Sequence, residues 1–125
     1  MHLNADHECF TCTRKFTTYA GMLIHAESGA CPGGIDAIDI NEAAAECYQW
    51  KFYISDDYRD DMVDRVDLKE EWSNPMPYSC PGCEFSCTKL SGLLMHVWSP
   101  ACDQDINEYP MDKLAHWLWK RLTRV

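Results

Sequence analysis

Eight cysteine and histidine side chains are spaced along the chain in the manner of metal ligands. They form two sets with identical gaps, C-x2-C-x12-H-x5-C: Cys9, Cys12, His25 and Cys31, then Cys80, Cys83, His96 and Cys102. Zinc takes four ligands in a tetrahedron, and thiolate and imidazole both suit it. Four protein ligands leave no open position, so the pattern predicts two structural Zn²⁺ sites. A disulfide scaffold in a secreted protein is the alternative, which the regularly placed histidine disfavours.

The two ligand sets indicate an internal repeat with an offset of 71 residues at all four positions. Several other residues keep the same offset, among them Gly21 and Gly92, Leu23 and Leu94, and Ala44 and Ala115. We therefore expect a duplicated unit, a zinc finger plus the segment after it. Each finger is too small for a core of its own, so zinc would supply folding free energy on the order of 10 kcal/mol.

The ligand pattern resembles the two-Cys, two-His zinc finger with the last His replaced by Cys. That family has an aromatic residue four positions after the second Cys and a Leu three before the first His. Here these positions hold Phe16 and Met22 in the first finger, and Cys87 and Leu93 in the second. The stretches LIHAESGACPGGID, LSGLLMHVWSPACDQ and ECYQWKFYISDDYRDD resemble those of fungal zinc-finger proteins. The resemblance covers most of the chain and implies a fold and zinc rather than an activity.

Cys87 is a thiol in the position of the family's core aromatic. We interpret it as a buried, inert thiol that packs as a small apolar side chain. The alternative is that it competes with Cys83 for the metal of the second finger.

Charge is concentrated between the two ligand sets. The 125-residue chain has a net charge of −9, and residues 32–79 hold four basic and twelve acidic side chains, a net −8. Such acidity argues against a general phosphate binder. The chain shows no apolar run long enough to span a membrane and no secretory signal. We expect an intracellular protein, cytoplasmic or nuclear, the nuclear placement resting on the resemblance alone.

The helix positions that read bases in DNA-binding fingers are poorly equipped here. They correspond to Thr18, Gly21 and Ile24 in the first finger and to Lys89, Gly92 and Met95 in the second. Only Lys89 is suited to read a base edge. The two finger helices are apolar nearly all round, so we expect them to be buried.

The segments after the fingers have helical patterns. Asn41 is a candidate N-cap for a first helix, which would have Ala43, Cys47, Trp50 and Ile54 on one face. A second helix is expected over 57–72, and a third is expected to begin at Pro110. The third would bury a stripe of Met111, Leu114, Ala115, Leu118, Trp119 and Leu122. Trp117 lies off this stripe, as an anchor for a partner or as part of a second packing face.

The predicted fold is a small, helix-rich, zinc-stabilised α+β protein. Its expected units are a first finger with its following helix at 7–54, an acidic helix and linker at 55–77, and a second finger with the C-terminal helix at 78–125. These units pack into one domain or, alternatively, stand as two finger units joined by an acidic tether. The oligomeric state is left open.

The sequence favours a protein–protein interaction module over an enzyme, and the resemblance implies a nuclear regulatory complex as its setting. No phosphate loop, nucleophile motif or open metal shell is visible. The candidate partner-binding residues are Trp117, Trp119 and Leu122. The alternatives are a nucleic-acid-binding regulator and a repeat that only stabilises a longer protein.

Overall fold

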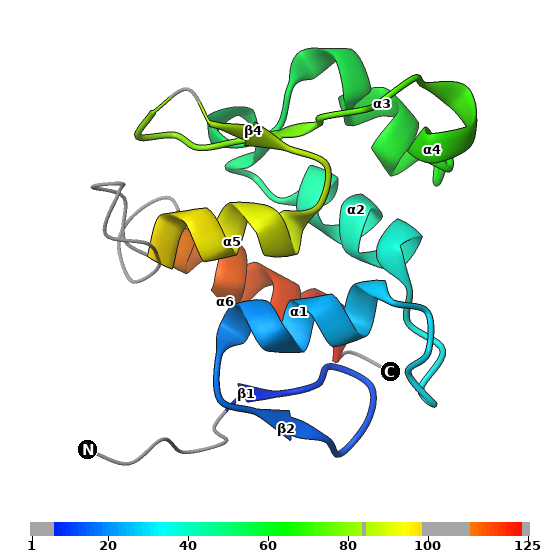
Figure 1. The fold of residues 1–125 in the computed structure, drawn as a ribbon, viewed down its shortest axis with the longest axis vertical. Helices are drawn as coiled ribbons and strands as arrows, with labels where there is room; N and C mark the ends of the chain where they lie inside the picture. The colour runs from blue at the N-terminus through cyan, green and yellow to red at the C-terminus, as the bar shows by residue number, and fades with distance from the viewer. Residues whose placement is uncertain (1–6, 84, 99–110, 124–125) are drawn as a thin grey trace.

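The computed structural model describes residues 7–83, 85–98 and 111–123, and it is helix-rich with two small antiparallel sheets, as predicted (Figure 1). Strand β1 (His7–Glu8) pairs with β2 (Lys15–Phe16), and helix α1 (Tyr19–Glu27) follows. Strand β3 (Tyr78–Ser79) pairs with β4 (Ser86–Cys87), and helix α5 (Leu90–Trp98) follows. The same order of elements thus occurs at both ligand sets.

Helix α2 spans Ala37–Glu46, so the prediction of a start at Asn41 and an end near Ile54 was wrong. Asp36 is the N-cap, and its carboxylate accepts a hydrogen bond from the backbone N–H of Asp39. The Asp39 carboxylate in turn accepts a hydrogen bond from the backbone N–H of Asp36. This capping box satisfies two helix-end donors that would otherwise lack partners. Asn41 instead accepts a hydrogen bond from the Tyr78 hydroxyl at 2.6 Å, which ties α2 to the second finger.

The acidic segment holds two short helices rather than the one predicted over 57–72. Helix α3 spans Asp56–Val63 and α4 spans Leu68–Glu71. Between them Arg65 has a φ of 62°, the left-handed region that ends a helix. A 3-10 turn, η1 (Trp50–Phe52), connects α2 to this segment.

Helix α6 (Met111–Leu122) buries three of the six residues of its predicted stripe against the rest of the molecule. Met111, Leu114 and Leu118 are at most 1% exposed, whereas Trp119 is 48% exposed and does not belong to the buried face. Pro110, the predicted first residue, lies outside the described residues.

The two finger helices lie side by side in the middle of the molecule (Figure 1). The last residue of α1, Glu27, contacts Ser91 in the first turn of α5, so the helices run antiparallel. Helix α2 packs on α1, α3 and α6. The finger helices bury Met22, Leu23, Ala26, Leu90, Leu93, Leu94 and Val97 in the core.

The prediction that the two apolar finger helices are buried was only partly right. Ile24 is 49% exposed on α1 and Met95 is 54% exposed on α5. These two residues occupy equivalent positions of the repeat. Each finger helix therefore keeps one large apolar side chain in contact with solvent.

Within the described parts of the chain, no helix combines the length and the apolar character needed to cross a bilayer.

Candidate metal centres

The first ligand set comes together between the β1–β2 hairpin and α1. Cys9 and Cys12 lie in the turn of the hairpin, where the Cys9 backbone N–H donates to the Arg14 carbonyl at 2.9 Å. His25 lies in the last turn of α1, and Cys31 follows that helix. The hairpin and the helix therefore approach the same point from two sides, and all four ligand atoms lie within 4.8 Å of one another.

The distances in the first cluster match a tetrahedral metal site. Cys9 Sγ and Cys31 Sγ are 3.7 Å apart, and Cys12 Sγ and His25 Nε2 are 3.5 Å apart. Ordinary zinc bond lengths place the corners of a tetrahedron about 3.8 Å apart for two sulfurs and about 3.6 Å apart for a sulfur and a nitrogen. The sulfurs are far beyond the bonding distance of a disulfide, about 2.05 Å, and the described cysteines are all free. This cluster could hold a metal ion.

The loop after α1 brings Cys31 into the cluster by a close backbone approach. The Thr11 hydroxyl lies 3.3 Å from Cys31 Sγ, and the Gly33 N–H donates to the same sulfur at 3.4 Å. A Cβ at Gly33 would lie 2.4 Å from both the Thr11 carbonyl oxygen and its Oγ1. Only glycine allows the loop to pass this closely over the hairpin turn.

These contacts also favour the thiolate, the form that binds metal. Burial raises the pKa of Cys31. Hydrogen bonds from the Thr11 hydroxyl and the Gly33 N–H, and those with Cys9 and His25, together outweigh burial and lower that pKa to about 6. A backbone hydrogen bond at Arg14 lowers the pKa of Cys12, but burial and the neighbouring thiols Cys9 and Cys31 together outweigh that bond. The net effect is a raised pKa for Cys12. A cation would relieve the crowding of these thiolates.

The second ligand set forms a cluster of three described residues, Cys80, Cys83 and His96. Cys83 Sγ and His96 Nε2 are 3.0 Å apart, and the Gly82 N–H donates to Cys80 Sγ at 3.4 Å. Cys80 is buried, whereas Cys83 is exposed. The fourth predicted ligand, Cys102, lies outside the described residues. This cluster, too, could hold a metal ion.

An aromatic ring packs on the histidine of each candidate metal cluster. Phe16 lies against His25 with ring centroids 5.1 Å apart, and Phe85 stacks on His96 at 4.1 Å with an interplanar angle of 5°. Sequence reasoning missed Phe85 because the family places its aromatic at position 87. Side chains two residues apart in an extended chain point to the same side, so an aromatic at 85 can do the work of one at 87. The two-residue periodicity of an extended chain was therefore the sequence signal that could have identified Phe85.

Cys87 does not belong to the second cluster. Its thiol donates to the Lys89 carbonyl at 3.2 Å. A Cβ on Gly92 would lie 3.4 Å from its sulfur, so the thiol packs against α5. Burial raises the pKa of Cys87 to about 11, although the backbone at Lys89 lowers it in part. The thiol is therefore protonated at neutral pH, which agrees with an inert packing role.

The three candidate partner-binding residues have different surroundings. The Trp117 indole N–H donates to the Ala43 carbonyl at 2.7 Å, so this ring is engaged within the chain. Trp119 is 48% exposed, and its ring centroid is 6.0 Å from that of Phe10. Leu122 is half-buried. Trp119 and Leu122 line an open groove together with the hairpin turn of the first finger.

No family model matches the chain, and no curated protein or solved structure matches it either.

Proposed function

We propose that the chain binds two Zn²⁺ ions at structural sites and that the folded unit serves as a protein–protein interaction module. The observation that carries the zinc proposal is the first cluster: the four ligand atoms lie within 4.8 Å of one another, and the Cys9–Cys31 and Cys12–His25 distances match the edges of a zinc tetrahedron. In the second finger the equal spacing assigns Cys102 as the fourth ligand. Two filled shells leave no open metal position for catalysis, which is why we propose no enzymatic activity.

The interaction proposal rests on what the finger helices present to solvent. Ile24 and Met95, at positions that would face a base in a DNA-reading finger, are apolar and about half exposed. Apolar side chains make poor contacts with the hydrated edges of a groove and good contacts with another protein. The surface of this protein is thus better suited to a protein partner.

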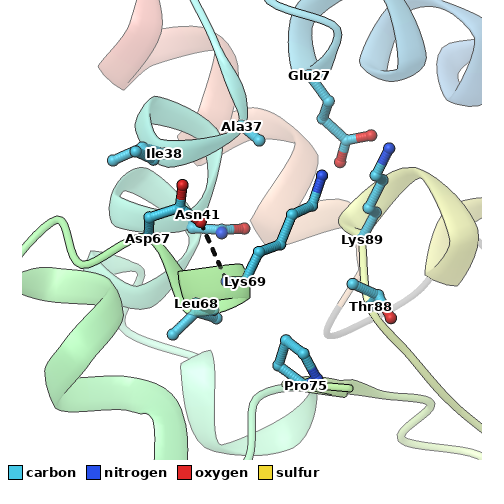
Figure 2. A pocket seen from close by; sticks show the side chains of 10 residues that line it. All are labelled: Glu27, Ala37, Ile38, Asn41, Asp67, Leu68, Lys69, Pro75, Thr88 and Lys89. Carbon is cyan, nitrogen blue, oxygen red and sulfur yellow. Dashed lines mark hydrogen bonds between the residues drawn. The ribbon is translucent and has the colours of Figure 1, made fainter. Parts of the chain in front are cut away.

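The basic residues give little support to the alternative of nucleic-acid binding. Arg121 bonds to Glu46 at 3.1 Å, and Lys89 lies beside the carboxylate of Glu27. Figure 2 shows the side-chain ends of Glu27, Lys69 and Lys89 pointing toward one another around a small cleft. Cations that face carboxylates within their own chain contribute less to phosphate binding.

The repeated ββα order, together with the 71-residue offset, supports an origin by duplication. We also propose a relation to fungal zinc-finger proteins, which rests on the resemblance of the sequence alone. We propose an intracellular placement, nuclear if that relation holds.

The metal proposal is tested by measuring zinc in the purified protein by elemental analysis. We expect two equivalents in the unmodified chain and one in a Cys12→Ser variant. A zinc-free, folded protein would overturn it.

The interaction proposal is tested with the zinc-loaded protein as bait in host extract. Ile24→Glu with Met95→Glu should abolish capture of a stoichiometric partner, while Tyr48→Glu, which changes a residue that is 92% exposed, should not. Equal capture by both variants would contradict the proposed surface. Binding to random duplex DNA or single-stranded RNA in fluorescence anisotropy, at about 50 mM salt, would favour the alternative.

A further inference from the structure

One buried carboxylate joins the two fingers. Glu27, the last residue of α1, is 8% exposed. Its two oxygens accept hydrogen bonds from the backbone N–H of Ser91 at 3.1 Å and from the Ser91 hydroxyl at 2.5 Å. Ser91 lies in the first turn of α5, so an acid from the first finger satisfies an N-terminal donor of the second finger's helix.

Each partner in this contact lies on the same helix as a histidine of its finger's ligand set. Glu27 follows His25 by two residues at the end of α1, and Ser91 precedes His96 by five residues on α5. A metal bound by His25 fixes the last turn of α1 and hence the position of Glu27. A metal bound by His96 fixes α5 and hence the position of Ser91.

The contact also tolerates little looseness. A buried carboxylate that loses its donors has a large desolvation penalty, so a displaced Glu27 is disfavoured as long as α1 and α5 remain packed. The apolar faces of the two helices pack on each other alongside it. Ordering one finger helix therefore removes part of the cost of ordering the other.

We infer that the two metal sites fill cooperatively and that Glu27 is the positioning residue that couples them. This inference rests on the proposed function, because it requires both clusters to bind metal. It predicts that metal at either site raises the affinity of the other site by the same factor, as linkage demands.

The experiment uses Co²⁺, whose absorption bands report tetrahedral thiolate ligation, on the full chain. A Cys83→Ser variant gives the affinity of the first site alone, and a Cys12→Ser variant gives that of the second site alone. The overall constant for filling both sites of the unmodified protein, divided by the product of these two affinities, gives the coupling factor. We expect a factor of about ten or more, within the usual range for coupled sites.

The same three measurements are then repeated in backgrounds that alter the contact. Glu27→Gln and, as a milder change, Ser91→Ala should each reduce the coupling factor at least about threefold. Glu70→Gln removes the same charge from an exposed side chain on α4 and should leave the factor unchanged.

The outcomes separate the two proposals. Two cobalt equivalents with a coupling factor of one would overturn the inference and leave metal binding intact. A factor that stays large in both Glu27→Gln and Ser91→Ala would overturn the role of Glu27. No cobalt–thiolate bands in the unmodified protein would overturn metal binding itself.

Discussion

The two fingers share their ligand spacing but differ in how the protein surrounds the ligands. In the first finger Cys12 is half-buried, and Thr11 and Gly33 hydrogen-bond to the Cys31 sulfur. In the second finger Cys83 is exposed, and the hairpin turn has Gly82 where the first has Thr11. Equal spacing therefore brings candidate ligands together in both fingers without specifying equal protection of a bound metal.

Metal removal should have the largest effect on folding, and the two fingers should release their metal at different rates. We expect a strong chelator to abolish the helical circular dichroism signal, because each site contributes on the order of 10 kcal/mol to folding. Metal should leave the second finger first, because exposed Cys83 is open to attack by the chelator. Stopped-flow release into a zinc indicator should show two phases, and Cys12→Ser should remove the slower one. Loss of the faster phase in that variant would contradict the difference in protection.

A glycine substitution should weaken one finger and spare the other. Gly33→Ala places a Cβ at 2.4 Å from Thr11 and forces the Cys31 loop away from the hairpin. We expect it to cost about 2 kcal/mol or more, roughly thirtyfold in the metal affinity of the first site.

The matched change in the second finger is Gly92→Ala, whose Cβ would lie 3.4 Å from Cys87 Sγ. Replacing a helical glycine removes backbone entropy, so this variant should change stability by less than about 1 kcal/mol. Competition titration against a chelator of known affinity measures the metal affinity of the Gly33→Ala and Gly92→Ala variants. Equal losses would show that the close approach at Gly33 is not specific to the first site.

The aromatic partners of the two histidines should contribute similarly despite their different positions. Phe85→Leu and Phe16→Leu should each cost about 1 kcal/mol of stability, since each removes a ring packed on an imidazole. Thermal unfolding of the zinc-loaded variants measures this. A large loss for Phe16→Leu alone would mean that Phe85 does not replace the aromatic missing at position 87.

The smallest effect concerns the protonation of Cys87. Its pKa is about 11 in the folded protein against a reference of 9.0, so the unfolded chain loses this proton first as the pH rises. The contribution of Cys87 to stability is present below pH 9 and is lost as the pH rises toward 11. Cys87→Ala should flatten that part of the curve of unfolding free energy against pH. An unchanged alkaline slope would contradict a half-buried, protonated thiol at Cys87.

The seven described members of the two clusters could be predicted from sequence, because the chemistry of metal ligands depends on residue type and short spacing. The helix ends were harder, because several residues compete for each role. Asn41 and Asp36 are both good N-caps, and the reciprocal bonds between Asp36 and Asp39 decide for Asp36. The break at Arg65 was not visible, because arginine carries no local signal for a left-handed conformation.

Contacts between distant segments were beyond sequence reasoning. Glu27 and Ser91 are 64 residues apart, and the Trp117–Ala43 bond spans 74 residues. Neither pair has a local pattern that identifies its partner, since packing of the finished fold creates both contacts. Both bonds connect a residue of the first expected unit, 7–54, to a residue of the last, 78–125.

The separation of Glu27 from Ser91 also has a consequence for how the protein is made. All four ligands of the first finger leave the ribosome well before α5 is synthesised, so the first zinc site can close early. At about 5 to 20 residues per second, the 64 residues that separate the pair take roughly 3 to 13 seconds. Throughout this interval α5 is not there to cover the apolar face of the nascent α1, and the Glu27 carboxylate has no hydrogen bond from Ser91. A chaperone that shields this face during translation would act in that window.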